Sequence, residues 1–197
     1  AASPAASGAM KPIGDVVAGL EHHAGLLDVY VDHPGGRVLV ALKPAADAGG
    51  LGRFLYQTYL RSGLGSTPVG LDRSLAADTQ LIAFRRAGRT VYAELENRAF
   101  RADRGSAAER AAVRESFAPS LVWSGAVLAE DTDGTVLIDL AAFLTRDVGV
   151  VEALAQAQQG DFRLDASLSY VEAGATHVFP ENVEFEAVAT YTSDKPG

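Results

Sequence analysis

The chain has 197 residues, enough for one well-filled hydrophobic core, and its 48% hydrophobic and 21% charged residues are ordinary for a folded domain. The net charge of −8 argues against a general affinity for nucleic acid or an anionic membrane, and no run approaches the roughly 18 apolar residues of a membrane-spanning helix. Because there is no cysteine, disulfides, thiolate metal sites and a cysteine nucleophile are excluded.

The first residues are small and contain neither a charged nor an apolar signal region. Residues 1–11 are therefore expected to be a flexible N-terminal segment, like the remnant of a cleaved signal peptide or a cloning junction. Residues 12–197 are expected to form a single domain. The glycine-rich run 49–52 is the one plausible flexible joint, and it is too short to separate two domains.

The first part of this region combines a short helix with hairpin signals. Apolar residues at helical spacing predict a helix over 13–20, closed by His22, His23 and Gly25. Two hairpins follow, each with a turn-rich tip between two strands, at 27–31 with 37–42 and at 79–85 with 90–96.

Between these hairpins, an aromatic-rich strand over 53–60 leads into a glycine-punctuated loop at 61–75. Ser106 and Glu109 form a capping box, which predicts a helix that ends before Pro119. The remaining expected elements are a strand at 121–128, its hairpin partner at 135–140, helices at 141–145 and 150–158, the second ended by Gly160, and strands at 166–171 and 183–192. Because hairpins outnumber crossover helices, the sequence predicts an α+β fold: a mostly antiparallel sheet built from hairpins, with three or four short helices inserted between them.

The loop at 61–75 reads RSGLGSTPVGLDRSL, and its glycines and hydroxyls raise the question of a phosphate site. A Walker-type loop needs a Lys next to a Ser or Thr after its last glycine, but Gly70 is followed by Leu71 and the acidic Asp72. The dinucleotide fingerprint fails because Pro68 holds the place of its third glycine. We therefore favour a structured surface loop with unusual backbone angles.

Metal chemistry has two possible sources in the sequence. The chain has four histidines: His22, His23, His33 and His177. None occurs in the His-Glu-x-x-His spacing that places two imidazoles on one helix face, so surface and helix-end histidines are favoured over a transition-metal site. The segment Asp-Thr-Asp-Gly at 131–134 resembles the start of a calcium loop, but Val136 and Ala142 occupy the places of its required Gly and Glu. A hairpin turn is the better interpretation.

Candidate catalytic groups are equally sparse. No Gly-x-Ser-x-Gly motif is present, and no base partner is evident for the serines considered, which are Ser66, Ser120 and Ser124. Glu184 and Glu186 project from one face of a predicted strand, which favours a solvated face over paired acid–base chemistry. Aromatic residues within predicted strands favour core packing over a stacking platform; these are Tyr30, Phe54, Tyr56, Tyr59 and Trp123. The sequence therefore predicts no catalytic, cofactor-binding or metal-binding residue in this chain.

Arginines are concentrated between Arg85 and Arg114, where eight of them occur with four acidic residues. The favoured interpretation is that they pair with acids elsewhere in the fold. A patch that binds an anion or a partner is the alternative.

Seven blocks of the sequence, in this order, resemble one family. They are GLLDVY at 25–30, SGLGSTPVGLDR at 62–73, LIAFRR at 81–86, AERAAVRESF at 108–117, VLIDL at 136–140 leading to FLTRD at 143–147, GDFRLD at 160–165 and FPENVEFE at 179–186. Together they resemble the amino-terminal domain, of unknown function, of large bacterial zinc-dependent metalloproteases. The resemblance runs from about residue 12 to residue 194.

The resemblance implies where this domain lies in a larger protein, but it assigns no functional site to this chain. In the family, zinc and the His-Glu-x-x-His helix lie in a later domain, so neither a zinc ligand nor a general base is carried over onto these residues. The implied role is a non-catalytic accessory domain of a secreted or periplasmic protein, whose partner is the catalytic domain of the same polypeptide. It implies no cofactor in this chain, while the charge and hydropathy of the sequence predict no nucleic-acid partner and no membrane insertion.

Two other functions remain open from the sequence. The first is a small stand-alone hydrolase in which His177 meets Glu184 or Glu186 in a deep pocket. The second is a peptide- or sugar-binding module with aromatic residues exposed on a concave face.

Overall fold

The computed structural model describes residues 10–47, 49–65, 69–96, 100, 102 and 104–195. Most of the expected flexible segment 1–11 lies outside the described residues. The elements in chain order are α1 (Ile13–Val17), β1 (Glu21–His23), β2 (Asp28–Asp32), β3 (Arg37–Leu42), β4 (Gly50–Tyr56), β5 (Gln80–Ala87), β6 (Thr90–Leu95), α2 (Ala107–Ser116), β7 (Ser120–Ala126), β8 (Ala129–Glu130), β9 (Val136–Asp139), α3 (Ala141–Leu144), α4 (Val150–Gln156), β10 (Arg163–Val171), the 3-10 turn η2 (Ala173–Ala175), β11 (His177–Val178), β12 (Val183–Glu184) and β13 (Ala187–Thr192).

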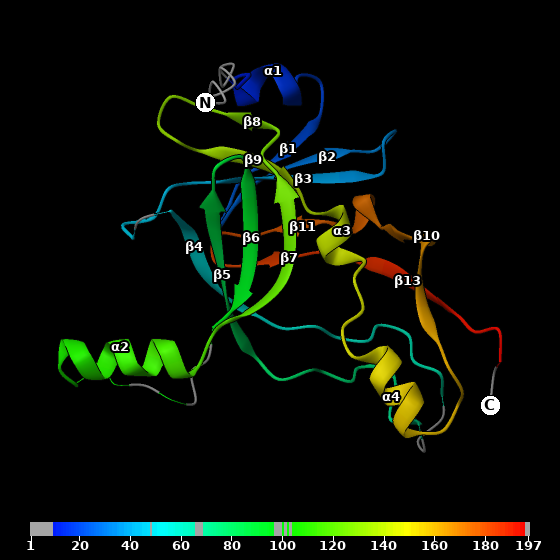
Figure 1. Ribbon diagram of the computed structural model, residues 1–197. Helices are drawn as coiled ribbons and strands as arrows, with labels where there is room; N and C mark the ends of the chain where they lie inside the picture. The colour runs from blue at the N-terminus through cyan, green and yellow to red at the C-terminus, as the bar shows by residue number, and fades with distance from the viewer. Residues whose placement is uncertain are drawn as a thin grey trace, which may run out of the picture.

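Strands dominate this structure (Figure 1). Its described strands form a five-stranded sheet in the order β1-β2-β3-β9-β8, a four-stranded sheet β4-β5-β6-β7, and the two-stranded pairs β10-β13 and β11-β12. Every one of these pairings is antiparallel. The protein is thus broadly α+β, with antiparallel, open sheets and few short helices; this confirms the predicted class, whereas the single sheet that was expected is divided into several.

The five-stranded sheet is covered on both faces. Val38, Val40 and Leu42 of β3 are buried in the main core, whereas Leu39 and Ala41 belong to a second cluster that includes Ile13 of α1. Successive side chains of a strand point to opposite faces, so both faces of β3 need apolar residues. This explains the uninterrupted apolar run at 38–42.

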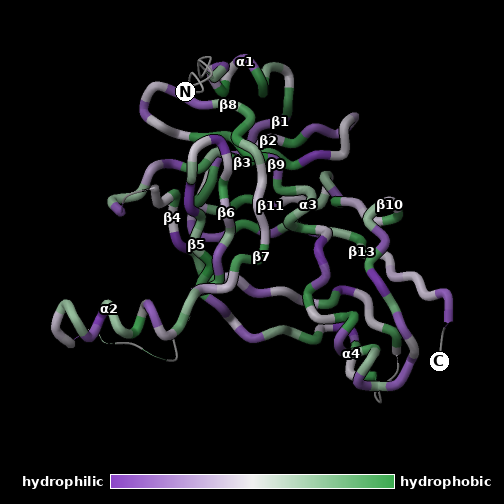
Figure 2. The backbone as a smooth tube through the Cα atoms, viewed as in Figure 1, coloured by the Kyte–Doolittle hydropathy of each residue, from purple (hydrophilic) through white to green (hydrophobic). Residues whose placement is uncertain are grey.

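The main core also includes the inner face of the four-stranded sheet. Ile82 and Phe84 of β5 and Val91 of β6 belong to the same buried cluster as Val40 and as Ile138 of β9. Figure 2 shows hydrophobic residues concentrated where these strands meet. Burial of this shared apolar surface is the main stabilising contribution to the fold.

Helix α2 is different, because it extends away from the sheets (Figure 1). None of its described side chains is buried, and only Ala111 and Val113 are half-buried. Its predicted capping box is confirmed: the Glu109 N–H donates to Ser106 Oγ at 3.2 Å, and the Ser106 N–H donates to Glu109 Oε2 at 2.6 Å. The helix is therefore closed at its start by local bonds rather than by packing.

Several boundaries differ from the sequence-based expectations. His22 and His23 do not close a helix; they lie in β1, which pairs with β2, while α1 ends at Val17. Strand β4 begins at Gly50 and ends at Tyr56, and the Arg86 N–H donates to Gly49 O at 2.7 Å. The supposed joint at 49–52 is thus bound into the four-stranded sheet by hydrogen bonds.

Two corrections concern the C-terminal part of the chain. Helix α4 ends at Gln156 instead of the expected 158, and both Gln158, with φ of 57°, and Gly160, with φ of 106°, have a positive φ after it. The strand expected over 183–192 is two strands, because β12 ends at Glu184 and β13 begins at Ala187. Glu186 lies in the break between them, so it does not share a regular strand face with Glu184.

Strand β5 is linked to β8 by an ion pair that predicts an acid sensitivity. Arg86 binds Glu130 through two hydrogen bonds of 2.6 and 2.7 Å, and this guanidinium holds the pKa of Glu130 below its usual value. A carboxylate whose pKa is lower in the folded state stabilises the fold above its unfolded pKa of about 4.3, and that contribution is lost as the pH falls through the folded value.

We therefore expect Glu130→Gln to flatten the loss of unfolding free energy between about pH 5 and pH 2, as measured by urea titration. The control is Asp161→Asn, since Asp161 is exposed and has no ion pair among the described residues. It should keep the wild-type pH dependence. An unchanged pH dependence in Glu130→Gln would contradict this role for the Arg86–Glu130 pair.

Candidate functional site

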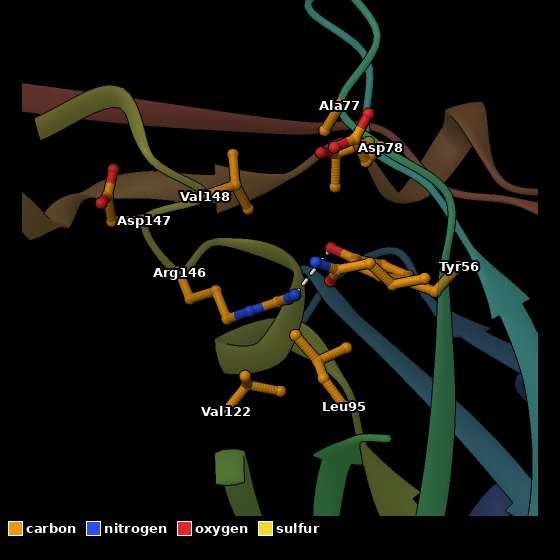
Figure 3. Close-up of a pocket in the computed structure, with 10 residues that line it drawn as sticks. Tyr56, Ala77, Asp78, Leu95, Val122, Arg146, Asp147 and Val148 are labelled. Atoms are coloured by element: carbon orange, nitrogen blue, oxygen red, sulfur yellow. Dashed lines mark hydrogen bonds between the residues drawn. The ribbon is translucent and has the colours of Figure 1, made fainter. Parts of the chain in front are cut away.

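A pocket of about 300 Å³ opens beside the end of the four-stranded sheet at which β4 ends and β5 begins. Tyr56 comes from the end of β4, Leu95 and Val122 from β6 and β7, Asp78 from the segment that leads into β5, and Arg146 from the turn after α3. In Figure 3, Arg146 extends toward Tyr56, with Asp78 on one side and Leu95 and Val122 on the other. The pocket therefore combines charged groups with an apolar floor, as small-molecule sites commonly do.

Arg146 is held in place by two hydrogen bonds and by aromatic contacts. Its Nη2 donates to Tyr56 Oη at 2.6 Å, and its Nη1 donates to Phe143 O at 2.5 Å. Its Cζ also lies 3.9 Å from the centre of the Phe143 ring, close enough for a cation–π interaction. The guanidinium is thus oriented by protein groups, although no carboxylate in the described part of the chain lies within salt-bridge distance of it.

The neighbouring Asp147 has a structural role. Its Oδ1 accepts hydrogen bonds from Val150 N at 3.1 Å and Val151 N at 3.3 Å, at the start of α4. The same oxygen accepts a bond of 2.9 Å from Tyr191 Oη, and burial together with this bond raises the pKa of Tyr191. Asp147 therefore caps α4 and anchors β13, and its carboxylate has little capacity left for a ligand.

The sequence did not single out this pocket. Tyr56 was expected only as a core residue, and Arg146 and Asp147 appeared only inside the block FLTRD. Tyr56 and Arg146 are 90 residues apart in the chain, so no local spacing signals their contact. The capping role of Asp147 was accessible, because an aspartate shortly before a helical run is a common N-terminal signal.

The structure brings two of the four histidines together. His23 Nε2 lies 3.0 Å from Glu21 Oε1, and His33 Nε2 lies 2.6 Å from Glu21 Oε2. These contacts with the histidines help to lower the pKa of Glu21. His22 instead bonds to Asp28 at 3.0 Å. Within the described ranges, no group of three or more His, Asp or Glu side chains is placed to hold a metal ion.

The proposed acid–base groups lie outside the pocket. His177 and Glu184 are opposite each other in the β11–β12 pair, and both are exposed. Glu184 accepts a bond from Asn182 at 2.9 Å, and Glu186 pairs with Arg61. In the part of the chain that the structure describes, no hydrogen bond joins His177 to either glutamate.

The segment 131–134 is a hairpin turn, as the sequence favoured, but it joins β8 to β9; β7, which was expected to be the hairpin partner, pairs with β6 in the four-stranded sheet. Gly134 has φ of 84°, and Asp133 Oδ1 accepts a bond of 2.9 Å from Thr135 N. Asp131 Oδ1 accepts a bond of 2.8 Å from Ile13 N, which ties this turn to α1. Its carboxylates therefore bond to the backbone of the turn and of α1.

The serine and aromatic candidates have separate outcomes. Ser120 and Ser124 lie in β7 opposite Leu95 and Tyr92, and Ser66 lies outside the described residues. Trp123, half-buried, contacts Phe143 with ring centres 6.0 Å apart, as expected of a core residue. Tyr59 is not in a strand core; it is 65% exposed in the loop after β4.

The arginine-rich stretch does not form one free positive surface. Arg85 bonds to Glu94 at 3.0 Å and to Asp47 at 3.1 Å, and Arg86 bonds to Glu130. For these two residues, the favoured interpretation of pairing with acids is confirmed. Arg98, Arg101 and the side chain of Arg114 lie outside the described part of the structure.

The glycine loop is a bonded structure, as predicted, although residues 66–68 fall outside the described ranges. The Leu64 N–H donates to Leu71 O at 2.8 Å, and the Leu60 N–H donates to Leu75 O at 2.9 Å. Leu71 is buried, and Gly65 and Gly70 have φ of 65° and 69°. The loop thus doubles back on itself between β4 and β5.

Comparisons with known proteins identify a family. The model of the family described as Domain of unknown function (DUF5117) matches residues 75–197, which is more than half of the chain. The chain therefore belongs to this family, and the match includes Asp78, Arg146 and helix α2 but not Tyr56. Neither a curated protein nor a solved structure matches the chain. Among the described helices, none is long and apolar enough to cross a membrane.

Proposed function

We propose that this chain is a non-catalytic accessory domain of a zinc-dependent metallopeptidase and docks onto the catalytic domain of the same polypeptide. The seven sequence blocks that resemble the amino-terminal domain of such proteases support this role, and membership of a family of unknown function is compatible with it. In this proposal zinc and the general base belong to the catalytic domain, and the parent protein is secreted or periplasmic. The accessory domain supports the catalytic domain or shapes substrate access.

The observation that carries the proposal is the free-standing helix α2. Most helices in proteins are stabilised by packing of one face, and an isolated helix of ten residues is marginal in water. At its base the rings of Phe100 and Phe117 stack with centres 4.1 Å apart, yet they remain 53% and 37% exposed. A helix with a capping box and an apolar base, but with no buried side chain among those that the structure describes, is suited to pack against another domain.

The test compares two matched substitutions in binding to the separately produced catalytic domain. Ala112→Glu adds a charged side chain to an exposed position of α2, and Ala155→Glu makes the same change at an exposed position of α4. Burying an unpaired charge at an interface costs several kcal/mol, so Ala112→Glu should weaken the complex at least about tenfold. Ala155→Glu should leave the dissociation constant unchanged, as measured by calorimetry.

Two results would contradict the proposal. One is equal binding by both variants and the wild type, which would exclude α2 as the docking element. The other is stoichiometric zinc binding together with peptide hydrolysis by this chain alone, which would show that it is an enzyme in its own right.

A further inference from the structure

The pocket at Arg146 contains hydrogen-bond donors that no described residue uses. A guanidinium has five N–H groups, and the bonds to Phe143 O and Tyr56 Oη use two of them. The Tyr56 oxygen accepts from Arg146, so its own O–H is available to donate. These donors are fixed side by side by the stacking of Arg146 on Phe143, and a forked set of donors of this kind matches a carboxylate.

The pocket also contains an unpaired negative charge. Asp78 lines the same cavity, is exposed, and has no hydrogen bond or ion pair within the described residues. In Figure 3 it lies on the other side of Tyr56 from Leu95 and Val122. Since Asp147 is engaged by α4 and Tyr191, Asp78 is the carboxylate that remains for a ligand.

These two opposite charges restrict the ligand. A simple anion such as phosphate would be attracted by Arg146 but repelled by Asp78, whereas a molecule with both charges satisfies both groups. The apolar floor of Leu95 and Val122, with Val148 at the side, suits an aliphatic side chain. A volume of about 300 Å³ is at the small end of ligand sites, which fits a molecule no larger than a short peptide.

We propose that this pocket binds a small zwitterion, a free amino acid or short peptide, with its carboxylate on Arg146 and Tyr56 and its ammonium group toward Asp78. This site lies on a different part of the fold from α2, and the proposal does not depend on the docking role. The proposal pairs the charges of Arg146 and Asp78 with the two opposite charges of a single ligand.

The test uses three peptides that differ by one charge each: leucyl-leucine, its N-acetyl derivative and its C-terminal amide. Binding to the whole chain is followed by NMR, with the signals of Tyr56, Leu95 and Val122 as reporters. Leucyl-leucine should bind at least about tenfold more tightly than either derivative, because each derivative leaves one charged protein group unpaired. Equal binding of the three peptides, or no shift of the reporter signals at any concentration, would overturn the proposal.

Two variants test the contributions of Asp78 and Arg146 separately. Asp78→Asn changes an exposed side chain to an isosteric one, so the fold is retained, and it should abolish the difference between leucyl-leucine and its acetylated form. Arg146→Gln should abolish the difference between the acid and the amide. If both variants keep the wild-type preferences, the pocket is not the binding site. Tighter binding of inorganic phosphate than of leucyl-leucine would also exclude the zwitterion.

Discussion

Replacing Phe143 with alanine is expected to lower the free energy of unfolding by about 3–5 kcal/mol, measured by chemical denaturation. Phe143 is 4% exposed, and its ring centre lies 5.7 Å from that of Tyr56 and 6.1 Å from that of Phe84. Truncation removes buried apolar surface and leaves a cavity between α3 and the four-stranded sheet. It also removes the ring on which Arg146 stacks, so the pocket should lose its order together with the core.

The matched control for this change is Phe179→Ala. Phe179 is 48% exposed, and its backbone N–H and C=O form hydrogen bonds that the substitution keeps. The same atoms are removed from the surface in this variant, so the free energy of unfolding should fall by about 1 kcal/mol or less. Similar losses in the two variants would contradict the central position of Phe143 in the core.

The parts of the fold that the sequence predicted are those determined by local chemistry. The hairpin of β2 and β3, closed by the turn-rich segment after Asp32, and the hairpin of β5 and β6, closed at Gly88, have strands and turn adjacent in sequence. The capping box of α2 is also local, since Ser106 and Glu109 are three residues apart. In each case a few neighbouring residues specify both the position and the type of element.

The errors arose where pairing with another segment of the chain decides the structure. His22 and His23 follow an apolar pattern of helical spacing and were expected to close the helix, but pairing with β2 makes them part of a strand. Run 49–52 has the composition of a flexible joint, yet hydrogen bonds with β5 hold it in the sheet. Tertiary contacts override local preference in both segments.

The candidate site could not be predicted for the same reason. Its walls come from five separate parts of the chain, and Tyr56, Asp78 and Arg146 are each ordinary residues in their own segments. The sequence shows neither that Arg146 has no carboxylate partner among the described residues nor that Asp78 lines the same cavity. The unpaired charges, which carry the ligand proposal, are properties of the folded chain alone.

The second large effect is expected in the glycine loop, where Gly63→Ala should lower the free energy of unfolding by about 1–3 kcal/mol. A Cβ at this position would overlap the backbone of Leu71 and Arg73, which run beside it in the second half of the loop. Backbone atoms cannot move aside as the end of a flexible side chain can. We expect the bond from Leu64 N to Leu71 O to open, and faster amide hydrogen exchange at Leu64 should report it.

The control for Gly63→Ala is a second glycine-to-alanine substitution that should not lower the free energy of unfolding. Gly14 lies in α1, has an ordinary negative φ, and a Cβ there would meet no atom within 4 Å. Alanine is the better helix former, so Gly14→Ala should be neutral or stabilise the protein by up to about 1 kcal/mol. A Gly63→Ala variant as stable as Gly14→Ala, with Leu64 still protected, would contradict the close approach of the two halves of the loop. If Gly63→Ala loses stability and Gly14→Ala does not, glycine is required at position 63 because two backbone segments pass close together there. The motif that resembled a phosphate loop then has a structural reason for its composition.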